Sequence, residues 1–494
     1  MDTQSSDPNN QHIIENNLSL GQALLPVFAL IGMLAYNVYV YGDSALDGSN
    51  QFILLMGAAV AAIVGYFNRV SYKTMVEEVA QNIKSTSGPI LILLMVGALS
   101  GTWLVSGIIP SMIYYGLQLL NPSIFLAACV VICSIISVAT GSSWTTSATV
   151  GIALIGISEA LGISLGMTAG AILSGAYFGD KLSPLSDTTN LAPAMAGTDL
   201  FTHIRYMLYT TVPSIIITLI VFIIIGLNLD TPDQVNTQKI LNAIDSAFTI
   251  SPWLFAVPLL VVFLIIKKTP PLVALLLGTL LAALASIFFQ PHVLNQIAGT
   301  DVLSISSAYR GIIDSITVSV QVPTDYTALN DLFSSGGMYG MLGTIWLIIC
   351  AMTFGGIMDA IGALSRISKA LLNLFHSTFG LFSSTVISCL ALNVTASDQY
   401  LAIVVPGKMF AKAYKDKGLA PENLSRTLED SATVTSVLIP WNTCGAYHSG
   451  VLGVPVLSYF TYAIFNYLSP FMTLLFAALN IKIRQLKNNK TSLA

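Results

Sequence analysis

The stretches ATGSSW (residues 139–144) and VTASDQ (residues 394–399) organise this sequence, because each is a short hydroxyl-rich segment between two long apolar arms. We name them the first and second polar segments. They lie about 255 positions apart, and Gly107 recurs as Gly362 at the same spacing. The repeated spacing predicts a tandem duplication with one polar segment in each half.

A second polar interruption follows each polar segment. It reads GDKLSPLSDTT (residues 179–189) in the first half and EDSAT (residues 429–433) in the second. Pro184 and Pro440 lie in or after these interruptions and break helical continuity, because proline lacks the backbone donor that a helix needs. The rest of the chain reads as an apolar scaffold that holds the four interruptions together.

The composition is that of a membrane protein. Of 494 residues, 54% are hydrophobic and 9% are charged, with a mean hydropathy of +0.76, whereas charged residues make up about a quarter of a soluble domain. The net charge of -4 argues against a nucleic-acid partner. The polar leader carries no basic residue before the first apolar run, so we predict no cleavable signal peptide.

A membrane core of about 30 Å requires about 20 apolar residues per helix. Stretches that meet or approach this length are 22–41, 52–67, 88–118, 206–228, 251–266, 271–289, 338–361 and 453–480. Four interrupted segments lie between them: 123–160, 165–200, 377–410 and 425–450. Each interrupted segment either crosses fully or enters and leaves on one side.

Basic residues choose between these topologies, because Lys and Arg accumulate in cytoplasmic loops. We take 123–160 and 377–410 as re-entrant hairpins and the other two segments as broken crossing helices. Lys239 and Arg310 then lie outside, and Lys181 lies within an interruption. Every other Lys and Arg lies on the cytoplasmic side. A crossing at the second hairpin would instead move the basic run that follows it outside.

The predicted fold is therefore an all-α polytopic membrane protein with two inverted repeats, about ten transmembrane helices, two re-entrant hairpins and two broken helices. We expect it in the cell (inner) membrane with both termini cytoplasmic. The predicted parts are a leader (1–20), a first repeat (21–228), an external linker (229–250), a second repeat (251–481) with an external loop (290–337), and a basic tail (482–494).

The interruptions are where we expect ion binding. Non-helical backbone is tolerated inside a membrane where it is buried in protein or lines a cavity, and broken helices in inverted repeats are typical of secondary transporters. A hard cation such as Na+ prefers oxygen ligands. The candidate ion- and substrate-binding residues are Thr140, Ser142, Ser143, Asp180, Asp187, Thr188, Asn393, Thr395, Ser397, Asp398, Glu429, Asp430, Thr433 and Asn442. Of these, we predict Na+ ligands at Asp187, Asp398, Ser142 and Ser397.

Each carboxylate also has a purely structural interpretation. A charge at the bilayer centre costs about 2.5 to 3.5 kcal/mol, so a role of some kind is expected for it. Asp180 and Glu429 could instead cap helix starts or pair with Lys181. Trp144 and Trp441, beside the polar clusters, are best explained by packing.

The run GDKLSPLSDTTNLAP (residues 179–193), with TGSSW before it and LEDSAT and PWNT after it, resembles the NhaC family of Na+/H+ antiporters. The resemblance covers residues 21–480 and implies membership of the ion transporter superfamily, whose members have inverted repeats with two re-entrant hairpins. It also implies that some relatives exchange organic acids such as malate and lactate, with Na+ and H+ as coupling ions.

The predicted function is Na+/H+ exchange by alternating access, with both ions competing for carboxylates near the membrane midplane. The alternative is a Na+- or H+-coupled carrier of a small organic anion or amino acid, since helix N-termini and Lys181 suit a carboxylate. A channel or an intramembrane enzyme is disfavoured, because the sequence has no catalytic Gly-x-Ser-x-Gly or His-Glu-x-x-His motif. We expect no cofactor; the expected partners are Na+, H+ and lipid, and a homodimer is left open.

Overall fold

The computed structural model describes residues 18–41, 48–119, 121–229, 237–267, 269–302, 304–324, 330, 333–374 and 377–486. Within these ranges the chain is helical apart from loops and one antiparallel pair of short strands, β1 (Val320–Gln321) and β2 (Ser334–Ser335). This confirms the all-α polytopic class. Most of the predicted leader, and residues 487–494 of the predicted tail, lie outside the described residues.

Eight helices in the described part are long and apolar enough to cross a membrane. They are α1 (Leu20–Tyr41), α2 (Ser49–Phe67), α4 (Ser87–Val105), α6 (Pro122–Thr140), α11 (Leu200–Leu227), α14 (Pro271–Phe289), α17 (Gly337–Gly340) continued by α18 (Leu342–Ala360), and α20 (Thr378–Thr395). The count rises to nine if α12 (Thr237–Ala247), η3 (Pro252–Phe255) and α13 (Ala256–Ile266), bent by 83°, form one span. Since α6 and α20 are the first arms of the predicted hairpins, re-entry stays a prediction.

The two polar segments have the same local structure. α6 is followed by Gly141, which is left-handed with φ 71°, and α20 is followed two residues later by Ser397, which is left-handed with φ 58°. The next residue in each case, Ser142 or Asp398, is extended and caps the following helix with its side chain. The spacing between these equivalent positions is 256 residues. A left-handed serine is strained, and such residues persist where surrounding contacts enforce them, often at functional sites.

The broken segments repeat at the same spacing. In the first half α9 (Leu165–Leu182) is followed by α10 (Asp187–Ala196). In the second half α22 (Pro421–Leu428), the π-helix η5 (Glu429–Thr433) and η6 (Ser436–Leu438) cover the equivalent of α9, and α23 (Thr443–Leu452) is the equivalent of α10. Both α10 and α23 are followed by a left-handed glycine, Gly197 and Gly453 respectively. The opposite membrane orientation of the halves stays a prediction.

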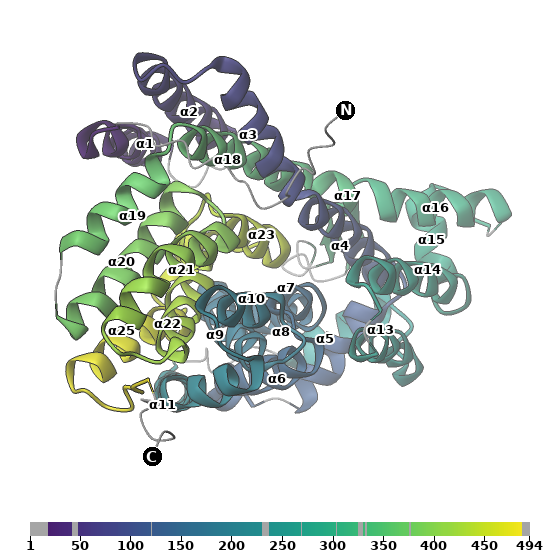
Figure 1. Ribbon diagram of the computed structural model, residues 1–494. Coiled ribbons are helices and arrows are strands. Elements are labelled where there is room, and N and C mark those ends of the chain that lie inside the picture. Colours follow the sequence, from purple (N-terminus) through teal and green to yellow (C-terminus); the bar gives the residue numbers. More distant parts are fainter. Residues whose placement is uncertain are drawn as a thin grey trace, which may run out of the picture.

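The halves interlock. α18, from the second half, packs against α2 and α3 (Tyr72–Ser85) of the first half. Its counterpart α4, from the first half, packs against α14, α17 and α16 (Ile305–Thr317) of the second half. These two groups flank a central body in which α6 to α10 lie beside α20 to α23 (Figure 1).

Shorter elements complete the described chain. They are α5 (Ile108–Leu119), α7 (Ser143–Thr146), the π-helix η2 (Ser147–Gly151), α8 (Ile152–Ala160), α15 (Pro291–Ala298), α19 (Ala363–Leu374), α21 (Gln399–Asp416), α24 (Val456–Phe460) and α25 (Ile464–Ala478). The segment predicted as the loop 290–337 contains α15, α16 and the small sheet, and it packs against α4.

Close helix contact positions the first broken segment. α6 and α9 approach so closely that a Cβ on Gly175 would lie 2.2 Å from the Val130 carbonyl oxygen, and one on Gly179 would lie 2.5 Å from that of Ser134. Small residues allow such approach between membrane helices. The contact brings Asp180, the residue after Gly179, to the end of α6 and the first polar segment.

Candidate ion-binding site

A cavity of about 590 Å³ lies where the two polar segments meet the first broken segment. The first polar segment contributes Thr140 to Ser142 and Trp144, the second contributes Gln399, and Tyr400 follows directly after the second. Other parts of the wall come from the start of α4 and from residues 269–271 before and in α14. Among the described residues that line it, the charged ones are Asp180 and Asp187. We call it the acidic cavity.

Asp180 is held by the first polar segment. Its Oδ2 accepts hydrogen bonds from the Ser143 backbone N–H at 3.0 Å and from the Ser143 hydroxyl at 2.6 Å. The side chain is buried, and its Oδ1 accepts no hydrogen bond from any described residue. The Thr140 hydroxyl also lines the cavity, and it has no hydrogen-bond partner among the described residues. One carboxylate oxygen is therefore fixed, and the other has capacity to bind a cation or proton.

Asp187 and Asp398 are connected through one tyrosine. The Tyr400 hydroxyl donates to Asp187 Oδ2, and the Tyr400 backbone N–H donates to Asp398 Oδ1 at 2.9 Å. Asp398 also accepts from the Leu401 N–H at 3.0 Å and so caps α21. Asp187 is exposed to the cavity, whereas Asp398 is buried. Tyr400 thus connects the broken segment of one half to the polar segment of the other.

Glu429 lies deeper, in the π-helix η5. It is fully buried, and its Oε1 accepts a hydrogen bond from the Thr188 hydroxyl at 3.1 Å. Its Oε2 has no hydrogen-bond partner among the described residues. A π-helical turn inside an α-helix frequently marks a functional site. Thr188 follows Asp187, so Glu429 is joined to the edge of the acidic cavity by a single residue.

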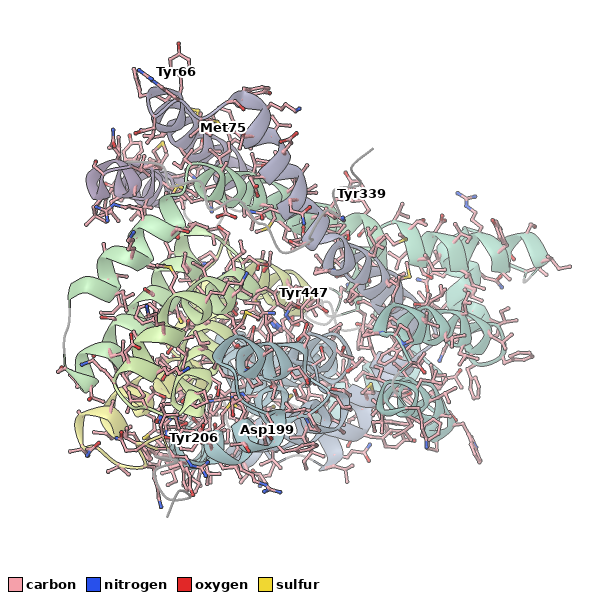
Figure 2. The ribbon with its side chains drawn as sticks, viewed as in Figure 1. Tyr66, Met75, Asp199, Tyr206, Tyr339 and Tyr447 are labelled. Atoms are coloured by element: carbon pink, nitrogen blue, oxygen red, sulfur yellow. The ribbon has the colours of Figure 1, made fainter. Side chains whose placement is uncertain are left out.

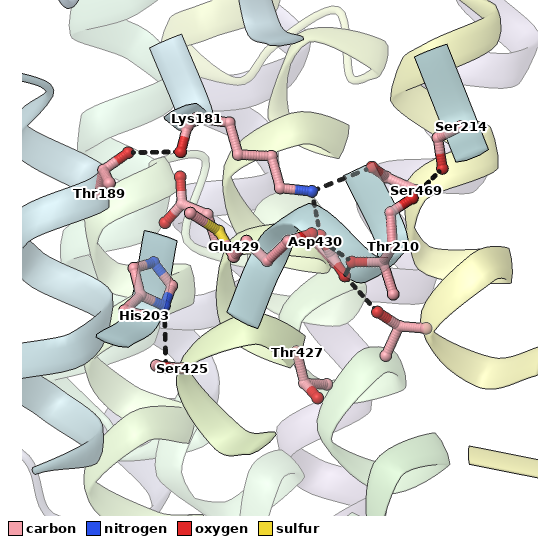
Figure 3. A network of polar contacts seen from close by, with 12 residues as sticks. Lys181, Thr189, His203, Thr210, Ser214, Ser425, Thr427, Glu429, Asp430 and Ser469 are labelled. Atoms are coloured by element: carbon pink, nitrogen blue, oxygen red, sulfur yellow. Dashed lines mark hydrogen bonds and ion pairs between the residues drawn. The ribbon is translucent and has the colours of Figure 1, made fainter. Parts of the chain in front are cut away.

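Asp430 does not line the cavity and belongs to a buried polar network with Lys181 and Thr210 (Figure 3). Its Oδ1 pairs with the Lys181 ammonium group, and its Oδ2 accepts from the hydroxyls of Thr210, at 2.8 Å, and Thr473. Lys181 also donates to the Ser469 hydroxyl at 3.3 Å. Both charges are fully buried. This ion pair joins α9 of the first half to η5 of the second, and together with the two hydroxyl donors it leaves neither oxygen of Asp430 without a partner.

The remaining predicted residues mainly hold backbone in place. The Asn393 amide donates to the Ala432 carbonyl at 2.7 Å, and the Asn442 amide donates to the Asn393 carbonyl at 3.0 Å. The Thr395 hydroxyl donates within its own helix, to the Ala391 carbonyl. Ser142 accepts from the Thr145 N–H at 3.1 Å as a helix cap. The hydroxyls of Ser397 and Thr433 are buried and have no hydrogen-bond partner among the described residues.

The structure therefore sorts the predicted residues into three groups. Thr140, Ser142, Asp180 and Asp187 line the acidic cavity. Ser143 and Thr188 contact those residues directly, Asp398 is connected to them through Tyr400, and Glu429 through Thr188. The other six are outside the cavity wall: Asn393, Thr395, Ser397, Asp430, Thr433 and Asn442. In the described part of the chain, no group of three or more His, Cys, Asp or Glu side chains could hold a metal ion.

Sequence reasoning missed Tyr400. It lies 256 positions after Trp144, and both residues line the acidic cavity. The repeat spacing could have identified Tyr400, because it is the equivalent of Trp144 in the second half and both residues are aromatic. Trp144 stacks on Tyr447, with ring centroids 4.0 Å apart, which agrees with a packing role for its ring.

Comparison with known proteins gives a consistent result. A profile of the Na+/H+ antiporter family matches residues 175–481. The Na+/H+ antiporter NhaC of Alkalihalophilus pseudofirmus is 36% identical over 470 residues, which is 95% of this chain and 98% of that protein. A malate-2H+/Na+-lactate antiporter of Bacillus subtilis is 37% identical over 89% of each chain. The arginine/ornithine antiporter ArcD of Halobacterium salinarum is 34% identical over 93% of this chain and 92% of that protein.

These relatives are transporters by name, and the match extends over nearly the whole chain. Because the match to the first of these relatives covers 95% of this chain, it includes the two polar segments and both broken segments. The chain belongs to the NhaC family of Na+/H+ antiporters.

Proposed function

We propose that this protein exchanges Na+ for H+ across the cell membrane and that the transported cation binds in the acidic cavity. The observation that carries the proposal is the charge of the wall: among the described lining residues, two are aspartates and none is Lys or Arg. Asp180 Oδ1 and the Thr140 hydroxyl have capacity for a ligand, and Asp187 completes an oxygen-rich site. Oxygen atoms of this kind suit Na+.

Competition for the same oxygens produces exchange when the site opens to the two sides alternately. A carboxylate oxygen binds either a proton or a cation, so occupation by one ion weakens binding of the other. Asp180 and Asp187 would be the shared site, with Asp398 and Glu429 connected to it through Tyr400 and Thr188. Coupling then requires that the site opens to one side at a time.

The repeat supplies a second cavity that fits alternate opening. It has a volume of about 390 Å³, and its wall includes Gly343, Leu347, Pro440 and Trp441. These residues lie 255 or 256 positions after Gly88, Ile92, Pro184 and Leu185, which line the acidic cavity. The two cavities are thus equivalents in the two halves. Related halves of opposite orientation would place them on opposite sides of the membrane.

The predicted topology assigns the sides. The acidic cavity contains Thr269 to Pro271, which follow the basic Lys267, and would open to the cytoplasm. The second cavity contains Asn50, Gln51, Gly453 and residues 455–458, which are predicted to be external. Trp441 lines the second cavity and donates from Nε1 to the Val394 carbonyl at 2.8 Å, so it would form part of the barrier between that cavity and the second polar segment.

A second candidate is coupled transport of a small organic anion or amino acid. Two observations favour it: relatives with such printed substrates, and a cavity volume within the range of small-molecule sites. Against a simple organic anion, Lys181 is fully buried and bound to Asp430 and Ser469, so it does not reach the acidic cavity. An anion there would meet two carboxylates. The charge of the wall therefore favours a cation.

The test is transport by purified protein in liposomes. An internal pH dye reports proton movement when an inward or outward Na+ gradient is imposed, with and without malate, lactate, arginine or ornithine. Proton movement with Na+ alone supports Na+/H+ exchange. Movement that requires one of the organic solutes establishes the second candidate and rejects the first.

A further inference from the structure

A third cavity, of about 500 Å³, lies at the beginning of α11, apart from the two cavities described above. It is lined by Thr202, Arg205, Tyr206, Tyr209, Lys482, Ile483 and Arg484. Among these described lining residues three are basic and none is acidic. We call it the basic cavity. Figure 2 shows Tyr206 and Asp199, from the same end of α11, in the lower part of the view, whereas Tyr447, which stacks on Trp144 of the acidic cavity, is near its centre.

Hydrogen bonds hold the wall of the basic cavity in place. The chain after α25 returns to α22: the Ala420 N–H donates to the Arg484 carbonyl at 2.9 Å, and the Asn423 amide donates to the same oxygen at 2.7 Å. The Tyr206 hydroxyl donates to Asn423 Oδ1 at 2.6 Å and to the Lys482 carbonyl. These bonds fix the terminal segment against α11, and they hold Lys482 and Arg484 beside Arg205.

The positive charge around this cavity exceeds the negative charge. No described residue forms an ion pair with Arg205, and the Lys482 ammonium lies 5.0 Å from the Tyr209 ring centroid. Arg484 pairs with Glu422 at 2.7 Å. Two carboxylates contact lining residues, Glu422 through Arg484 and Asp199 through the Thr202 N–H at 2.9 Å, against three lining cations.

A fourth cation lies behind Tyr206. Arg426 is fully buried, and its guanidinium carbon is 4.5 Å from the Tyr206 ring centroid. None of its Nε, Nη1 and Nη2 atoms donates a hydrogen bond to a described residue. A buried guanidinium without a paired carboxylate raises the electrostatic potential of its surroundings, because low-polarity protein screens charge poorly. The charge of Arg426 therefore favours binding of an anion in the basic cavity.

The same end of α11 carries an exposed apolar surface. α11 is long and apolar enough to span a membrane, and its exposed apolar or aromatic residues near this end are Phe201, Leu208, Tyr209 and Val212. Tyrosine together with Lys and Arg is typical of the membrane–water interface. Basic pockets between membrane helices on the cytoplasmic side bind the phosphorylated head groups of anionic lipids.

We propose that the basic cavity binds a phosphate-bearing anion, with Arg205, Lys482 and the Thr202 hydroxyl as its donors. The exposed apolar face of α11 beside the cavity suits an acyl chain, so the phosphate of an anionic phospholipid is the expected source. Free inorganic phosphate shares the same chemistry and is distinguished by experiment. The site does not depend on the identity of the transported ion.

The test measures binding by the full-length protein purified in a neutral detergent. Native mass spectrometry would follow the addition of phosphatidylglycerol, phosphatidylcholine with the same acyl chains, or inorganic phosphate. Phosphatidylglycerol should bind, phosphatidylcholine should not, and R205Q/K482Q should weaken phosphatidylglycerol binding by at least about tenfold, because each basic residue near an anionic lipid contributes substantially. Binding of inorganic phosphate that is lost in the same variant would identify free phosphate as the source.

The matched control is K408Q/K412Q. It removes the same charge from exposed positions on α21 that do not line the basic cavity. The single variant R205Q covers the case in which the double variant fails to fold, since Arg205 is exposed. Equal phosphatidylglycerol binding by wild type, R205Q and R205Q/K482Q, or equal binding of the two lipids, would overturn the proposal.

Discussion

The Tyr400 hydroxyl donates a hydrogen bond to the carboxylate of Asp187, across 213 positions of the sequence. The donor belongs to the helix that follows the second polar segment, and the acceptor begins α10 of the first half. The Tyr400 backbone N–H at the same time donates to Asp398. A movement of one half relative to the other would therefore alter a contact at the acidic cavity, which is a simple way for conformation to affect ion binding.

The two cavity aspartates are expected to be essential for exchange. D180N and D187N keep the size of the side chain and remove its charge, so Na+-driven proton movement in liposomes should fall to the level of protein-free vesicles. The control is D416N, an exposed position at the end of α21. Wild-type rates in both D180N and D187N would reject the cavity as the ion site.

Two substitutions at Asp398 distinguish a role of its charge in exchange from a role in capping α21. Asn is as good a helix cap as Asp, whereas Ala loses about 1 kcal/mol of stability at such a position. If the Asp398 charge serves exchange, D398N should lose transport while its thermal unfolding midpoint stays near that of wild type. Retained transport in D398N combined with a lowered midpoint in D398A would assign Asp398 to capping alone.

Removal of the Tyr400 hydroxyl should change Na+ affinity without preventing folding. A hydrogen bond to a charged group contributes about 1.5 to 3 kcal/mol, so Y400F should shift the Na+ concentration for half-maximal exchange by about tenfold or more. The control is Y66F, because Tyr66 is exposed at the end of α2 (Figure 2). An unchanged half-maximal concentration in Y400F would show that the hydrogen bond does not influence the site.

Direct competition predicts a pH-dependent Na+ affinity. If Na+ displaces one proton, the apparent dissociation constant should rise as pH falls, approaching tenfold per pH unit well below the pKa of the shared group. Equilibrium Na+ binding to purified protein across about pH 5.5 to 8.5 measures it. A flat curve would instead indicate a separate proton carrier that is coupled through conformation.

The Lys181–Asp430 pair is expected to stabilise the contact between the halves. Loss of one partner leaves an uncompensated buried charge, which costs about 3 to 5 kcal/mol, whereas apolar replacement of both is often tolerated. K181M and D430L should each lower the unfolding midpoint in detergent, and K181M/D430L should be more stable than either single variant. A double variant as unstable as the summed single effects would argue against mutual compensation.

Labelling of single cysteines would test the two-sided arrangement. The five native cysteines are all buried and free, so background reaction should be low. An impermeant thiol reagent added to intact cells should react with S449C, in the second cavity, and not with T269C, in the acidic cavity, or with K415C. Reaction of K415C from outside would contradict the hairpin topology.

The sequence by itself determined the class, the duplication and the places where helices break. Apolar composition decides that the chain enters a membrane, because polar backbone must be satisfied within helices there. Gly141 and Ser397 lie in segments that were located from hydroxyl-rich composition and repeat spacing alone, and both are left-handed in the structure. These features depend on a few neighbouring residues, so local sequence is sufficient to predict them.

The tertiary structure decided which polar side chains meet. Asp180 and Asp187 share the cavity, Asp430 is occupied by Lys181, and Tyr400, which sequence reasoning did not select, bridges the halves. Lys181 and Asp430 are 249 positions apart, and each interruption offered several carboxylates with similar local surroundings. Their partners follow from how α9, α10, η5 and α21 pack, and that packing is set by many distant apolar contacts and close glycine approaches rather than by the sequence next to each carboxylate.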